Sequence, residues 1–131
     1  MKIKTITTIL LVLFSVTVTA VEVSPFERAE ITEEQWSQYH SAVNKELSNS
    51  RRAYEKHYLE VYSDDVSRAS IAFTMLGHKA HPAWVTRQVV MDGESISMQV
   101  IGYFAGDEEA FNVLFKQYQE MASRTQQKFK R

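Results

Sequence analysis

The chain has 131 residues, with 15 basic and 16 acidic side chains and no cysteine. This composition excludes disulfide bonds, and the balanced charge argues against nucleic acid as a partner, because that ligand demands a basic face. The length fits one ordinary domain.

Residues 1–20 resemble a secretory signal peptide. Lys2 and Lys4 precede the apolar run "ITTILLVLFSVTV", and Val18 and Ala20 occupy the small-residue positions before a cleavage site. The run is shorter than the roughly 20 residues that span a bilayer. We therefore expect cleavage after Ala20 and no stable membrane span afterwards, with an uncleaved N-terminal anchor as the alternative.

Removal of this segment leaves 13 basic and 16 acidic residues, a net charge of −3. Exported animal domains usually carry disulfides. A domain without cysteine therefore fits a bacterial periplasm or secreted space better, and we expect an exported protein of that kind.

Residues 21–31 have no clear period and are predicted to be a linker that could dock on the domain. Thr32 and Gln35 have the capping-box spacing that begins a helix. A stripe at alternating steps of four and three residues then predicts one long helix to about Tyr62. The segment "SNS" at 48–50 leaves a break there as the alternative, because Ser and Asn side chains compete for backbone hydrogen bonds.

Residues 68–76, "RASIAFTML", alternate between apolar and small or polar side chains and predict a strand. Helical spacing over residues 65–76 leaves a short helix as the alternative. The helix begun by the cap at Asp107 closes the domain, with acidic residues in its first turn.

The dipeptide Asp92-Gly93 separates two β-rich runs and predicts a hairpin with a two-residue turn. That register pairs Arg87 with Met98 and places Arg87 on the apolar face, between Val85 and Val89. The other face reads as polar enough to meet water.

Together these elements predict one α+β domain over residues 32–131. It has two layers: a long N-terminal helix, a three-stranded antiparallel meander, and a C-terminal helix packed on one sheet face. We expect both helices on the same face, since an antiparallel sheet can leave the other face to solvent.

Arg87 is the candidate ligand-binding residue. An arginine on an apolar face needs an acidic partner or an anionic ligand. Its candidate partners are Glu46, Glu55 and Glu60, and the alternatives are that its head reaches solvent past the sheet edge or that the register differs.

The segment "GHKAHPAW" contains the candidate metal ligands His78 and His81. A zinc site needs about three protein ligands, and His40 and His57 lie too far apart on one unbroken helix to join them together. We therefore expect no metal and no cofactor, and a loop bend that carries two histidines.

Trp84, Tyr103 and Phe104 gather near the open end of the hairpin and are the candidate interaction surface, because interfaces favour aromatic groups. No nucleophile motif singles out a catalytic residue, so an enzyme is unsupported. The first hypothesis is an exported domain that binds an envelope protein, for example as its inhibitor or immunity partner. The alternative is a small-ligand binder, or an unrecognised enzyme, with Arg87 holding an anion in a helix–sheet cleft.

Overall fold

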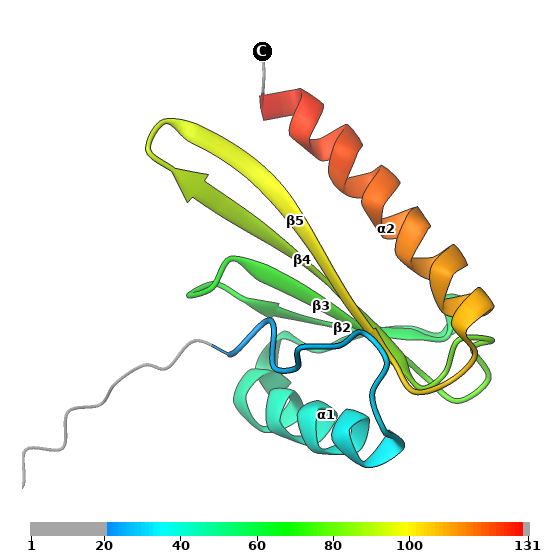
Figure 1. Cartoon of the computed structure of the whole chain (residues 1–131). Helices are drawn as coiled ribbons and strands as arrows, with labels where there is room; N and C mark the ends of the chain where they lie inside the picture. Colours follow the sequence, from blue (N-terminus) through cyan, green and yellow to red (C-terminus); the bar gives the residue numbers. More distant parts are fainter. Residues whose placement is uncertain (1–20, 130–131) are drawn as a thin grey trace, which may run out of the picture.

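The computed structural model describes residues 21–129, so the predicted signal peptide lies outside the described residues. The helices are α1 (Glu33–Leu47) and α2 (Glu108–Phe129), and the strands form one antiparallel meander in chain order (Figure 1). The remaining elements are β1 (Arg52–Tyr54), β2 (Leu59–Asp64), β3 (Ala69–Thr74), β4 (Ala83–Asp92), β5 (Ser95–Phe104) and two 3₁₀ turns, η1 (Ser48–Ser50) and η2 (Glu55–His57).

The α+β class and the packing of the C-terminal helix on the sheet are confirmed, but the meander has five strands and not three. The prediction of one helix to about Tyr62 is wrong. The helix ends at Leu47, and η1 occupies the Ser-Asn-Ser segment where a break was the alternative. Tyr58, with φ of 52°, then directs the chain into β2. Residues 52–54 and 59–64 therefore add two strands.

The predicted first residues of the two helices are confirmed by the hydrogen bonds of their N-terminal caps. Thr32 Oγ1 accepts from the Gln35 backbone N–H at 3.1 Å, and Gln35 Oε1 accepts from the Thr32 N–H at 3.0 Å. Asp107 Oδ2 accepts from the Ala110 N–H at 2.9 Å before α2. The segment left open between helix and strand is a strand, β3.

The β4–β5 turn differs from the prediction by one position. Asp92 pairs with Ser95, so that Gly93 and Glu94 form the turn. Gly93 has φ of +59° at the first central position, where a type II′ turn takes glycine. The turn moves by one residue on each strand, so Arg87 pairs with Val100 instead of Met98. This is a shift of two positions in the pairing, so each side chain stays on the face of the sheet that was predicted for it.

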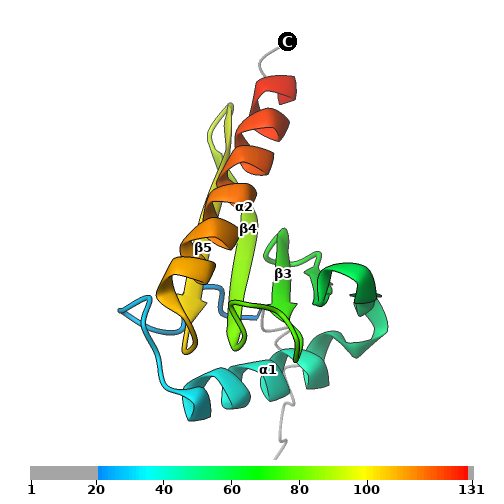
Figure 2. The same ribbon diagram turned by 90° about the vertical axis from the view of Figure 1, so that its right-hand side faces the viewer.

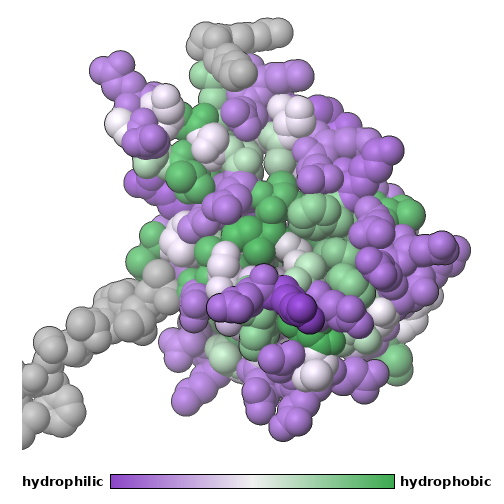
Figure 3. All heavy atoms as spheres, in the orientation of Figure 1, coloured by the Kyte–Doolittle hydropathy of each residue, from purple (hydrophilic) through white to green (hydrophobic). Residues whose placement is uncertain are grey.

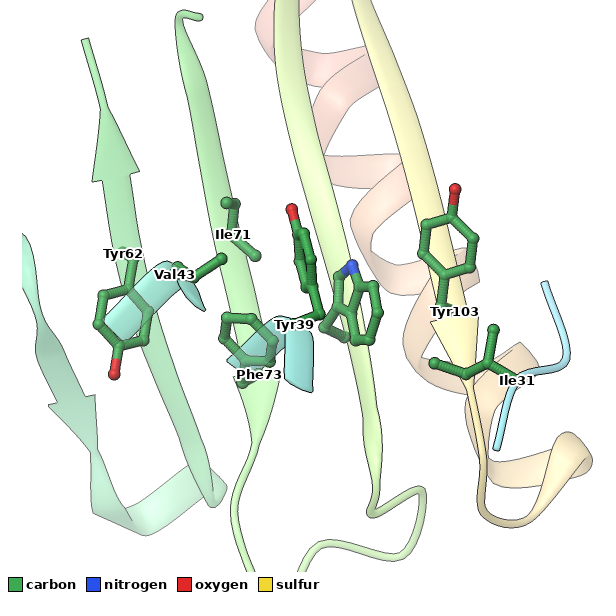
Figure 4. Close-up of a cluster of buried hydrophobic side chains, with 8 residues drawn as sticks. Ile31, Tyr39, Val43, Tyr62, Ile71, Phe73 and Tyr103 are labelled. Atoms are coloured by element: carbon green, nitrogen blue, oxygen red, sulfur yellow. The ribbon is translucent and has the colours of Figure 1, made fainter. Parts of the chain in front are cut away.

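The two helices cover opposite faces of the sheet, which corrects the expectation that both share one face (Figures 1 and 2). Figure 4 shows the α1 side, where side chains from four neighbouring strands meet Tyr39 and Val43 of α1. The sequence predicts a solvent-facing surface here because Thr86, Gln88 and their neighbours on this face of the hairpin are polar, but α1 covers it. Its buried members include Tyr62, Ile71, Phe73, Trp84 and Tyr103.

The segment before α1 pairs with the C-terminal end of β5. Ile31 N–H donates to Phe104 O at 2.9 Å, and Phe104 N–H donates to Ala29 O at 2.8 Å. Tyr103 Oη donates to Phe26 O at 2.8 Å, and Phe26 packs against the α1-side core. Residues 21–31 are therefore part of the folded layer on this side.

The α2 side of the sheet is only partly covered. Helix α2 packs mainly against β5 and β4, and Figure 2 shows β3 beside the helix and not beneath it. Hydrophobic side chains are visible where β5 and α2 lie together, within a largely hydrophilic surface (Figure 3). Of the two helices within residues 21–129, neither has a stretch long and apolar enough to cross a bilayer.

Candidate functional site

The uncovered half of the sheet forms the floor of a cleft of about 790 Å³ beside α2. Leu59, Val61, Ser63 and Ser70 provide this floor from β2 and β3. The helix contributes one wall, and η1, β1 and η2 contribute the opposite rim. The wall and rim consist of Leu114, Gln117, Tyr118 and Met121, and of Asn49, Ser50, Arg51, Arg52, Tyr54 and His57. Small-molecule sites typically have volumes of roughly 300–1,000 Å³, so the cleft has the size of a ligand site.

Arg87 reaches this cleft from β4. The guanidinium carbon lies 5.6 Å from the ring centroid of Tyr118, which is a cation–π contact with α2. The Nε atom is buried and has no hydrogen-bond partner within residues 21–129. No carboxylate of the described residues forms an ion pair with Arg87. A buried guanidinium N–H without an acceptor is costly, so this group is suited to receive an anion.

None of the three acidic partners expected for Arg87 fills that role. Glu60 points to the α1 side, where it accepts from Arg51 Nε at 2.8 Å. Glu46 and Glu55 are exposed and form no ion pair within residues 21–129. The sequence predicts the face of the sheet on which Arg87 lies. It does not predict that Glu60 points to the opposite face, because that depends on residues 59–64 forming the strand β2.

The lining of the cleft is cationic. It contains Arg51, Arg52, Arg87 and His57, and no Asp or Glu is among its residues. Arg51 is already paired with Glu60. Arg52 lies opposite Val61 on the outer strand and has no ion pair in the described part of the chain. Arg52 and Arg87 therefore flank a floor of two apolar residues and two serines, and neither arginine forms an ion pair within residues 21–129.

Tyr118 is held in the wall of this cleft. Burial raises the pKa of its hydroxyl, and the positive charge of Arg87 opposes that shift only in part. The phenol therefore stays neutral near physiological pH and can donate a hydrogen bond to a ligand.

His78 and His81 form hydrogen bonds at the loop between β3 and β4. His81 Nδ1 lies 3.0 Å from the Thr74 carbonyl oxygen, and His78 Nδ1 accepts from the Ala80 N–H at 2.9 Å. Burial lowers the pKa of both imidazoles. Across residues 21–129, no three His, Asp or Glu side chains come together as a metal site.

The aromatic residues expected to form an interaction surface lie in the core. At most 7 % of Trp84, Tyr103 or Phe104 is exposed. Tyr39 of α1 stacks on Trp84 with ring centroids 4.4 Å apart. Trp84 and Tyr103 are buried because α1 covers the face that was expected to meet water. Phe104 lies on the other face, where it stacks on Phe111 of α2.

A second polar cluster on the α1 side was not anticipated. Glu60 is buried and accepts from His40 Nε2, from Arg51 Nε and from Tyr62 Oη, the last at 3.1 Å. His40 is also stacked on Trp36, with ring centroids 4.9 Å apart. Glu60 is paired within this cluster, so we assign the cluster to stability.

Comparisons of this chain with protein-family models, with curated proteins and with solved structures give no match. Its function is therefore inferred from the geometry and charge of the cleft.

Proposed function

We propose that this chain is an exported domain that binds a small amphipathic anion in the cleft between α2 and the uncovered half of the sheet. The observation that carries the proposal is Arg87, whose Nε is buried without an acceptor in a cleft whose lining contains no acid. This proposal corresponds to the alternative that the sequence analysis left open, a small-ligand binder with Arg87 in a cleft. An Arg87 without an ion pair in a pocket is the feature that favours a ligand-binding domain over a protein-binding domain.

The chemistry of the lining favours a ligand with two parts. A carboxylate, sulfonate or phosphate fits a guanidinium, because the planar fork of arginine donates two parallel hydrogen bonds to such groups. The apolar part of the ligand would lie on Leu59 and Val61 and against Leu114 and Met121. Ser63, Ser70 and the Tyr118 hydroxyl supply further hydrogen bonds.

Two fluorescent probes that differ by one sulfonate group test this proposal. 1-Anilinonaphthalene-8-sulfonate carries a sulfonate, and N-phenyl-1-naphthylamine has the same aromatic skeleton without it. We expect tighter binding of the sulfonate. The substitution Arg87→Gln should weaken it about ten- to hundredfold, since a hydrogen bond to a charged group contributes roughly 1.5–3 kcal/mol.

The control variant is Arg28→Gln, which removes an exposed arginine that lines none of the described clefts. It should leave both affinities unchanged, and Arg87→Gln should leave binding of the uncharged probe nearly unchanged. Equal binding of the two probes, or sulfonate binding that is indifferent to Arg87, would contradict the proposal.

A protein-binding function would need a surface other than the buried aromatic residues. Met91 and Ile96 face each other at the tip of the β4–β5 hairpin and are 52 % and 39 % exposed. Cross-linking of the tagged chain in the envelope of its native cell tests this second function. One dominant partner, lost when both residues are replaced by serine, would favour it.

A further inference from the structure

Asp64 is a buried carboxylate that has no cationic partner in the described part of the chain. It is 6 % exposed, and neither ion pair within residues 21–129 includes it. Its oxygens accept from Val66 N–H at 3.1 Å, from Ser67 Oγ at 2.8 Å and from the Val21 nitrogen at 3.0 Å. Burial of a carboxylate is unfavourable unless a positive charge compensates it.

The Val21 nitrogen is the one donor of the three that comes from far along the chain, 43 positions before Asp64. Its position is fixed on both sides. Val21 packs against the α1-side core, and the carbonyl oxygen of Glu22 accepts from Tyr39 Oη at 2.6 Å. The nitrogen is therefore held against the carboxylate by the fold.

The chemical state of this nitrogen depends on processing. Within an uninterrupted chain it is a neutral amide with one proton. After hydrolysis of the Ala20–Val21 bond, water has added across the peptide, Ala20 ends in a carboxylate, and Val21 carries an α-amino group. An α-amino group has an ordinary pKa of about 7.7–8.0, so it is largely an ammonium at neutral pH.

We infer that a signal peptidase cleaves between Ala20 and Val21 and that the new α-ammonium forms an ion pair with Asp64. The mature N-terminus then supplies the cation that this buried carboxylate lacks. The inference joins two independent observations, the small residues Val18 and Ala20 of the cleavage motif and the contact of the next residue with Asp64. It does not depend on the proposed ligand.

The surroundings favour a positive charge at this point. The titratable side chains that act on Tyr39 beside this point are Tyr103, Glu22 and Asp64. Burial first, and then these neighbours, raise the pKa of Tyr39. Tyr39 therefore remains neutral, and its hydroxyl donates to the Glu22 carbonyl oxygen and not to Asp64.

The test begins with expression of the full chain in a bacterial host and purification from its periplasm. N-terminal sequencing and intact mass should identify Val21 as the first residue. Acylation of the α-amine at pH 7 is then followed by peptide mass mapping in the wild type, in Asp64→Asn and in Asp65→Asn. The Asp64→Asn variant keeps an oxygen for the Val66 N–H and loses the charge. Asp65 is an exposed neighbour, and the Val21 nitrogen donates to Asp64 and not to it.

We expect acylation at least tenfold faster in Asp64→Asn than in the wild type, and an unchanged rate in Asp65→Asn. A mature N-terminus other than Val21, or an amine equally reactive with and without the Asp64 charge, overturns the inference. If Asp64→Asn does not fold, the wild-type amine is compared with the same amine in urea. Protection of less than tenfold on folding then overturns it.

Discussion

Gly102 of β5 lies directly beneath Phe115 of α2. A β-carbon added to Gly102 would come 2.7 Å from Phe115 Cδ2 and 2.6 Å from Phe111 Cζ. Real β-carbons do not approach other atoms so closely, so the absence of a side chain at this position lets α2 pack tightly on β5.

The substitution Gly102→Ala should therefore destabilise the fold by roughly 1–3 kcal/mol, because overpacking forces side chains and backbone to move. Urea unfolding followed by circular dichroism measures this loss. A second substitution, Phe115→Ala, should cost less in the Gly102→Ala background than in the wild type, because it removes one of the two rings that the added methyl group meets. A Gly102→Ala variant as stable as the wild type would show that the helix does not depend on this close approach.

The free energy of unfolding should depend on pH through the carboxyl group of Glu60. Burial alone would raise the pKa of its carboxyl, but hydrogen bonds from His40, Arg51 and Tyr62 outweigh burial and leave the pKa below the ordinary value of 4.5. The unfolded chain therefore takes up the proton first as the pH falls. The stabilisation by Glu60 is fully present above about pH 4.5 and is lost as the pH falls through the lowered pKa.

The variant Glu60→Gln should lose roughly 1–3 kcal/mol at pH 7, and its difference from the wild type should shrink below pH 4.5. Unfolding curves at pH 7, 5, 4 and 3 measure the difference. The exposed Glu55→Gln serves as the control. A difference that is the same at pH 3 as at pH 7 would refute the role of this charge.

Arg68 offers a site for stabilisation. It occupies the turn between β2 and β3 with φ of 56°, and its side chain is exposed. A non-glycine residue in this left-handed region costs about 1–2 kcal/mol, and glycine avoids the penalty at some entropic cost of its own. Arg68→Gly should thus raise the free energy of unfolding by about 0.5–1 kcal/mol, whereas Arg68→Val should lower it. Thermal melts of the three proteins would decide, and a destabilised glycine variant would contradict the argument.

Local signals predicted the parts of the fold that depend on neighbouring residues. The Thr32–Gln35 capping box, the Asp107 cap and the β4–β5 hairpin all lie within a few residues of their partners. The segment 52–62 carried a helical spacing that the structure does not use. Residues 59–64 form a strand because β2 pairs with β3. That pairing is a tertiary contact, which the hydrophobic spacing of a short segment does not show.

The same error concealed most of the site. Arg87 was found because strict alternation placed it on an apolar face, and a slip of one residue on each strand leaves that alternation intact. A helix–sheet cleft around Arg87 was the alternative hypothesis, but its floor and rim from β1, η2 and β2 could not be predicted while those residues were assigned to a helix. Trp84 and Tyr103 were expected at the surface because both helices were placed on the other face of the sheet, whereas α1 covers them.

The cleft has a simple geometrical origin. Five strands about 4.8 Å apart make a sheet nearly 20 Å wide, whereas one helix is only about 10–12 Å across. Helix α2 packs on β4 and β5 and so leaves a strip of sheet open whatever side chains line it. Substitutions at the rim or floor could therefore alter ligand preference while the hollow itself persists. The side chains that line the cleft can therefore change while the sheet and α2 keep their arrangement.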